Sequence, residues 1–123
     1  MDDGSRHHAA AMNLSERQYQ DAAFPTLGAL IEALDEHPDG LFAELAGDVL
    51  TIEFDDRSRY VVNSHAAARQ IWMAAERSAW HFDYEPESEA WIEKKSGAEL
   101  WATLEEVLGK KLGRSLRLTR PAR

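Results

Sequence analysis

The sequence predicts an α+β fold in which two helices, one near each end of the chain, cover one face of an antiparallel sheet of about six strands. Three observations predict it: a capped helical segment begins at Ser15, short alternating runs fill the middle of the chain, and a second capped helical segment begins at Ser96. Consecutive strands joined by short turns pair antiparallel. The second face of this two-layer sandwich must then meet solvent or a partner.

The first helix is predicted from Ser15, which caps it and forms a capping box with Gln18. An apolar face with helical spacing follows, made by Leu27, Leu30, Ile31 and Leu34. Pro25 removes a backbone donor from this segment, so we expect a kink near residues 22–24 or a helix split in two. The helix should end before Pro38, because the residue preceding a proline is pushed toward extended geometry.

Six runs with strand character follow: residues 41–46, 49–54, 59–63, 70–75, 80–84 and 90–94. Turn dipeptides such as Asp39-Gly40 and Gly47-Asp48 separate the first elements. Residues 64–68 are expected to form a loop or a single helical turn. Because the connections are short, each strand should pair with the next one along the chain.

The last helix is predicted from a capping box made by Ser96 and Glu99. Its apolar face consists of Leu100, Trp101, Leu104, Val107 and Leu108, with Lys111 at the edge. Either Gly109 or Gly113 should end it. A domain over residues 14–113 is therefore expected, between a flexible N-terminal tail (1–13) and a basic, solvated C-terminal tail (114–123).

Composition limits the functions that the chain can have. Its 123 residues are enough for one domain, and they include no cysteine, which excludes disulfides, thiolate metal sites and cysteine nucleophiles. No stretch approaches the roughly 20 apolar residues of a membrane span, and the N-terminus lacks the apolar run of a secretory signal. We expect a cytoplasmic protein with no membrane partner. His7–His8 belong either to a disordered tail or to a metal site.

Several consecutive segments match one known family. They are residues 47–54, 61–63, 69–74 (Arg-Gln-Ile-Trp-Met-Ala), 80–84 (Trp-His-Phe-Asp-Tyr), 91–92 and 96–101. Over these segments, from about Ser15 to Leu112, the chain resembles bacterial frataxins of the CyaY type. The resemblance implies a helix–sheet–helix fold, weak binding of Fe²⁺ or Fe³⁺ on a surface acidic ridge, and docking to the cysteine desulfurase and the scaffold protein of iron–sulfur cluster assembly.

The charge distribution gives the first candidate site. Residues 18–56 hold ten acidic and no basic side chains, whereas residues 109–123 hold six basic and no acidic ones. The acidic segment should repel nucleic acid and attract cations or basic partners. The candidate iron ligands are Glu32, Asp35, Glu36, Asp39 and Glu44. Composition alone favours a solvated acidic face, while the resemblance favours a functional ridge; His37 is either a nitrogen ligand within it or an ordinary surface histidine.

Trp72 gives the second candidate site. It alternates with Ile71 and Met73, so it faces away from the helices if those two residues face them, and lies in the core if the phase is reversed. An exposed Trp on a bare sheet face is typical of a partner-binding surface. The predicted partner-binding residues are Asn63, Gln70, Trp72, Asp48 and Glu53.

Together these observations predict an accessory protein, either an iron donor (an iron chaperone) or a regulator of cluster assembly. The alternative is a protein-interaction module that regulates the desulfurase without physiological metal binding. A third hypothesis, a weak ferroxidase, is less favoured, and the chain holds no Gly-rich phosphate loop, HExxH or CxxC motif. We therefore expect no enzyme, and a monomer that forms oligomers, if at all, only with metal.

Overall fold

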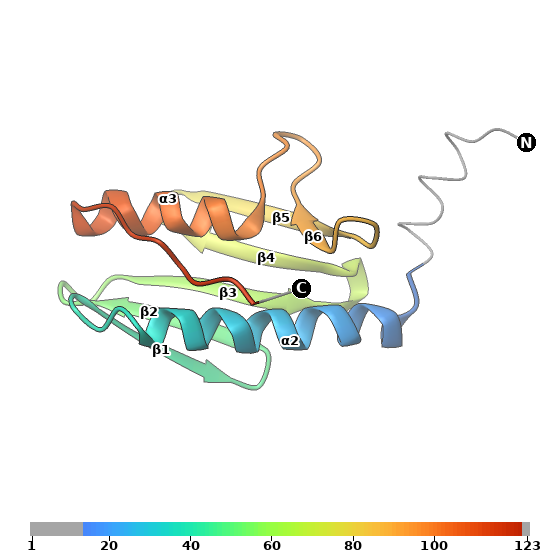
Figure 1. Cartoon of the computed structure of the whole chain (residues 1–123), viewed down its shortest axis with the longest axis horizontal. Helices are drawn as coiled ribbons and strands as arrows, with labels where there is room; N and C mark the ends of the chain where they lie inside the picture. The colour runs from blue at the N-terminus through green and yellow to red at the C-terminus, as the bar shows by residue number, and fades with distance from the viewer. Residues whose placement is uncertain (1–13, 122–123) are drawn as a thin grey trace, which may run out of the picture.

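The computed structural model describes residues 14–121 and shows two helices on one face of a six-stranded sheet (Figure 1). The elements are α2 (Glu16–Asp35), β1 (Leu41–Ala46), β2 (Val49–Phe54), β3 (Arg59–His65), the 3₁₀ turn η1 (Ala66–Ala68), β4 (Gln70–Ala75), β5 (Ser78–Glu85), β6 (Ala90–Ile92) and α3 (Leu100–Leu112). The strands lie in chain order, and every neighbouring pair is antiparallel. The predicted α+β two-layer sandwich is confirmed.

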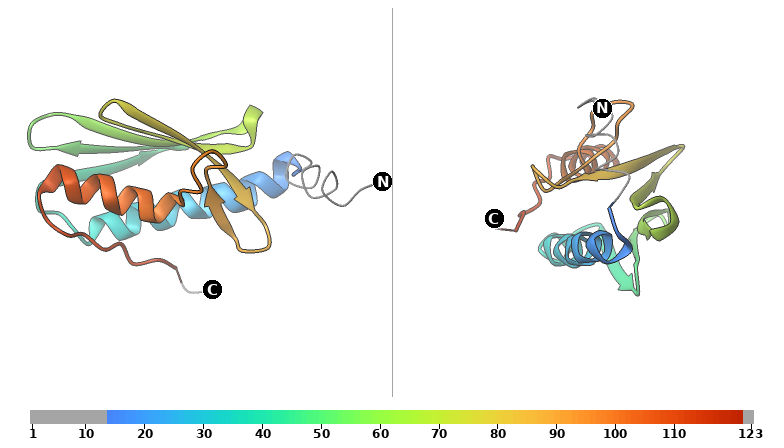
Figure 2. Two further views of the ribbon diagram at one scale, coloured as in Figure 1. Left: turned by 90° about the horizontal axis from the view of Figure 1, so that it is seen from above. Right: turned by 90° about the vertical axis from the view of Figure 1, so that its right-hand side faces the viewer.

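The core lies between the sheet and the helix pair, which lie side by side on one sheet face (Figure 2). Fully buried strand residues include Leu50, Ile52, Val62, Ile71, Met73 and Phe82. The helices contribute Leu27, Leu30 and Leu34 from α2 and Leu100, Leu104 and Leu108 from α3. Within residues 14–121, no helix has the length and apolar character needed to cross a membrane.

Helix α2 runs unbroken through Pro25, so the predicted split is wrong. Its start is as predicted: Ser15 Oγ accepts from the Gln18 amide (3.0 Å), and the Gln18 side chain accepts from the Ser15 amide (2.9 Å). A proline inside a helix costs about 3 kcal/mol. The apolar face continues on both sides of it, from Ala23 to Leu27, and is fully buried against the sheet. That burial outweighs the lost backbone bond.

Helix α3 begins three residues later than the predicted capping box would place it. Glu99 is itself the N-cap, and its carboxylate accepts from the amides of Trp101 and Ala102, both at 3.0 Å. Ser96 instead closes the preceding turn, where its hydroxyl donates to Glu93 at 2.7 Å. Gly113, at φ 70°, ends the helix in the left-handed conformation that glycine adopts without strain.

The segment after α3 packs on the domain, and the prediction of a solvated tail is wrong for residues 114–121. This segment runs back from the end of α3 toward α2 (Figure 1). Leu116 and Leu118 are buried and belong to the core cluster, and the Leu118 amide donates to Glu105 Oε2 at 2.8 Å. The predicted N-terminal tail with His7–His8, and residues 122–123, lie outside the described residues.

Candidate functional site

Trp72 lies on the sheet face that the helices leave uncovered. Its neighbours Ile71 and Met73 are 0% and 1% exposed and point into the core, whereas Trp72 is half-buried on the other side. The predicted outward phase is therefore confirmed. In the strand register, Trp72 lies opposite Asn63 of β3 on one side and opposite His81 of β5 on the other.

The indole ring of Trp72 is stacked between two imidazole rings. The ring centroids of His65 and Trp72 are 3.8 Å apart with an interplanar angle of 13°, and those of Trp72 and His81 are 4.3 Å apart at 16°. The three rings come from β3, β4 and β5 in turn. We refer to this arrangement as the His–Trp–His stack. It was not predicted, because it depends on which outward-facing residues meet across three strands.

Hydrogen bonds fix the edge of the same indole. Trp72 Nε1 donates to Gln70 Oε1 at 2.8 Å, and Gln70 Nε2 donates to Asp83 Oδ1 at 3.2 Å. Gln70 therefore flanks Trp72, as predicted. Asn63 lies across from Trp72, but its amide group donates to the Ser64 carbonyl at 2.9 Å. Both residues contribute polar surface beside the stack.

Helix α2 supports the stack from the opposite sheet face through Tyr19. The Tyr19 hydroxyl donates to the Gln70 carbonyl (2.7 Å) and accepts from the His65 amide (2.9 Å). Gln70 and His65 are register partners at the end of the β3–β4 ladder, so the hydroxyl bridges the two strands where they join η1. Burial raises the pKa of Tyr19, which keeps the hydroxyl protonated and able to donate.

The predicted acidic ridge is exposed but does not converge on one point. Glu32, Asp35, Glu36 and Asp39 are all exposed, and Glu36 Oε1 accepts from Thr119 Oγ1 at 3.0 Å. Within residues 14–121, no group of three or more His, Asp or Glu side chains is placed to hold one metal ion. The helix acids therefore offer a negatively charged surface, and iron binding by these residues stays a prediction.

The other predicted acids lie on the sheet. Glu44 (β1) and Glu53 (β2) occupy outward-facing positions of their strands, on the same sheet face as Trp72, so Glu44 lies on a different face from the acids of α2. Asp48, in the β1–β2 turn, accepts a short hydrogen bond from the Ser64 hydroxyl and ties that turn to the end of β3. His37 is half-buried after the end of α2.

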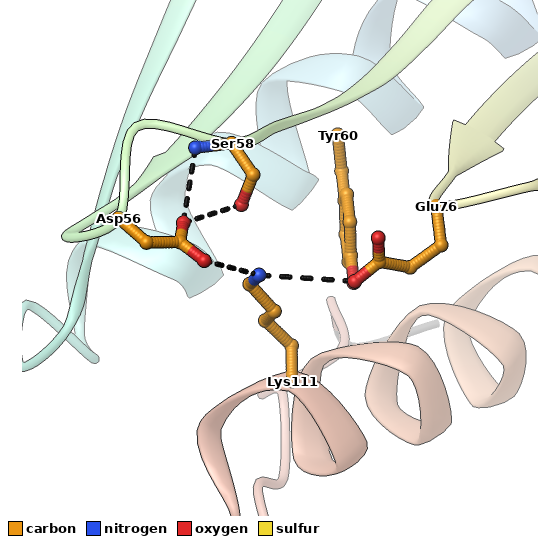
Figure 3. A network of polar contacts seen from close by, with 5 residues as sticks. All are labelled: Asp56, Ser58, Tyr60, Glu76 and Lys111. Carbon is orange, nitrogen blue, oxygen red and sulfur yellow. Dashed lines mark hydrogen bonds and ion pairs between the residues drawn. The ribbon is translucent and has the colours of Figure 1, made fainter.

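A second polar network lies where the β2–β3 turn and the β4–β5 turn meet the last turn of α3 (Figure 3). Lys111 Nζ lies 2.7 Å from Asp56 Oδ2 and 3.7 Å from Glu76 Oε1, and Tyr60 donates to Glu76 at 3.1 Å. Lys111 holds the pKa of Asp56 well below its usual range, helped by the Ser58 hydroxyl and amide. This network joins two turns of the sheet to α3, which is a structural role.

A family model, described as a frataxin-like domain, matches residues 12–114. The chain belongs to the frataxin family. Similar relatives are the iron–sulfur cluster assembly proteins CyaY of Pseudomonas putida strain W619 (35% identity, covering 85% of this chain and 96% of the relative) and of Thioalkalivibrio sulfidiphilus (36% identity, 76% and 89%). The resemblance seen in the sequence to CyaY-type frataxins is thus confirmed.

Solved frataxin structures share the fold. Frataxin from Psychromonas ingrahamii superimposes with a TM-score of 0.78 at 22% identity, over 86% of this chain and 99% of that one, which shows the fold alone. Trimeric frataxin of Saccharomyces cerevisiae complexed with ferrous iron matches with a TM-score of 0.65 at 28% identity, over 76% of this frataxin and 87% of the yeast chain.

Proposed function

We propose that this frataxin is an accessory protein of iron–sulfur cluster assembly that works by docking, with Trp72 at the centre of its docking face. The observation that carries the proposal is the placement of Trp72 on an uncovered sheet face, held by Gln70 and flanked by Asn63. A rigid aromatic side chain in a polar surround is typical of an interface hot spot. The family's role supports the scaffold protein of cluster assembly as the partner of this face.

The exposed acids of α2 are proposed to meet the cysteine desulfurase through a basic patch on that enzyme. Like charges at helical spacing repel one another by a few tenths of a kcal/mol per pair, and a basic partner relieves that cost. Carboxylates also suit hard and borderline cations, so iron in the Fe²⁺ or Fe³⁺ state is the proposed cargo of the same ridge. Because the ligands do not converge, binding should be weak and partly hydrated.

The docking role of Trp72 is tested with Trp72→Ala and purified scaffold protein. Truncating an interface hot spot costs at least about 2 kcal/mol, so affinity should fall about 30-fold. Phe24→Ala is the matched control, because Phe24 is 51% exposed on α2 in the helix layer. Equal affinities of wild type and Trp72→Ala, with both folded by circular dichroism, contradict the docking face.

The ridge is tested with Glu32→Lys, Asp35→Lys and Glu36→Lys combined, against purified desulfurase at low salt. The control reverses three exposed acids elsewhere, Glu16, Glu85 and Glu87, with the same change in net charge. A charge-driven interface predicts a marked loss for the first variant only. If both variants lose affinity equally, the effect is one of net charge, and the ridge is not the docking surface.

Iron binding is tested by anaerobic Fe²⁺ titration followed by amide resonances. Signal loss concentrated at residues 32–48 supports the ridge, while loss scattered over both helices removes the metal part of the proposal. A protein that binds the desulfurase and shows no saturable iron site selects the alternative, a metal-independent regulator.

We also propose that the protein is not an enzyme. Iron oxidation no faster than in buffer at matched pH is the expected result, and faster oxidation supports the ferroxidase hypothesis. A cytoplasmic monomer is proposed, and sedimentation with and without Fe²⁺ checks whether metal drives oligomers.

A further inference from the structure

We propose that His65 and His81 are positioning residues of the docking face: they clamp the indole of Trp72 from both sides. The inference rests on the proposed function for the role of Trp72 in docking. The clamp itself is a property of this chain alone, so it can be measured without a partner.

Stacking on the indole of Trp72 orients the two imidazole rings. His65 Nδ1 is buried and has no hydrogen-bond partner among residues 14–121. The His65 backbone amide, not its ring, is bonded to Tyr19. His81 is exposed, and its backbone amide donates to Glu93 Oε2 at 3.3 Å. For both rings, the contact that defines the plane is therefore the indole of Trp72, at centroid distances of 3.8 and 4.3 Å.

The clamp determines which part of Trp72 a partner can touch. With an imidazole on each face, the indole offers its edge, and its Nε1 is already held by Gln70. A partner that stacks a flat group directly on the indole face is excluded, whereas one that packs against the indole edge and the outer face of the exposed His81 fits. Because the side chain is fixed before docking, little rotamer freedom is lost on binding, which is worth about two- to tenfold in affinity.

Two double variants separate the loss of stacking from the loss of the imidazole rings themselves. His65→Ala with His81→Ala removes the clamp, while His65→Phe with His81→Phe keeps aromatic faces beside the indole. His37→Ala is the control for a histidine outside the stack. In each protein the Trp72 indole Nε1–H resonance, assigned with Trp72→Phe, is recorded at pH 7.5, and affinity for purified scaffold protein is measured at the same pH.

The expected result is a Trp72 indole resonance at the wild-type position in His37→Ala and a displaced one in the alanine pair, because the ring currents of the two stacked imidazoles are lost. Affinity should fall two- to tenfold in the alanine pair and return to the wild-type value in the phenylalanine pair. An alanine pair whose indole resonance stays at the wild-type position overturns the proposal, as does an alanine pair with wild-type affinity. If Trp72→Ala itself binds the scaffold normally, the proposed docking function fails, and that outcome is separate because the resonance still reports the clamp.

Discussion

We predict that the hydroxyl of Tyr19 makes the main polar connection between α2 and the strands that carry the His–Trp–His stack. The substitution Tyr19→Phe tests this prediction. The substitution keeps the buried ring, which meets Trp91 edge-on at 6.1 Å, and removes only the oxygen. That oxygen links the His65 amide (2.9 Å) and the Gln70 carbonyl (2.7 Å) at the end of the β3–β4 ladder.

The expected cost follows from the two backbone groups left unpaired. An unsatisfied donor or acceptor that was buried costs about 1–3 kcal/mol. The bonds are partly buried, and the strand end can relax, so we take the lower value for each and expect a loss of about 2 kcal/mol in the free energy of unfolding. For a domain of about 100 residues, this lowers Tm by about 10 °C.

Urea unfolding measures the loss, which should appear as a lower midpoint with an unchanged m value. Hydrogen exchange should show faster exchange of the His65 amide than in wild type. Tyr60→Phe is the control, since it removes a tyrosine hydroxyl bonded only to the Glu76 side chain at 3.1 Å. A loss below about 0.5 kcal/mol, the range of ordinary surface substitutions, with unchanged exchange at His65, refutes the reasoning.

Three further predictions concern stability. Leu118→Ala should cost about 2 kcal/mol in urea unfolding, because Leu118 is 5% exposed in the core cluster, whereas the exposed neighbour Arg117→Ala should change little. Burial raises the pKa of Tyr19 and of Tyr60, so the unfolded chain loses these protons first; stability should fall as pH rises above about 10, and less so in Tyr19→Phe. The lowered pKa of Asp56 gives stability that is present above about pH 4 and lost as pH falls further, so acid unfolding should be less steep in Asp56→Asn.

The order of elements could be predicted from the sequence because each one carries a local signal. Alternation placed the strands, helical spacing placed both helices, and the phase of Ile71 and Met73 placed Trp72 outward. The errors came where a local signal was outweighed by packing. Pro25 predicted a kink or a split, yet α2 is not split, because its buried face holds the helix together.

What could not be predicted depends on contacts between distant residues. The His–Trp–His stack depends on the register of three strands. The alternating pattern does not determine that register, because a shift of two residues leaves the same face buried. The Tyr19 hydroxyl bonds to His65 and Gln70, which lie 46 and 51 positions further along the sequence. The segment 114–121 has a basic sequence because of its arginines. Its two leucines, Leu116 and Leu118, fill space that exists only once α2 and α3 are side by side.

The acid-only segment seen in the sequence is divided by the fold into two surfaces. The helix acids Glu32, Asp35 and Glu36 are exposed in the helix layer, whereas Glu44 and Glu53 lie on the opposite sheet face with Trp72. A single small partner cannot contact both layers of a sandwich at once. Two partners can, or one assembly that reaches around the β1 edge, and the proposed docking to a desulfurase and a scaffold is compatible with either arrangement. The same division separates Glu44 from the candidate iron ligands Glu32, Asp35 and Glu36 at the end of α2, so Glu44 cannot share one ion with them.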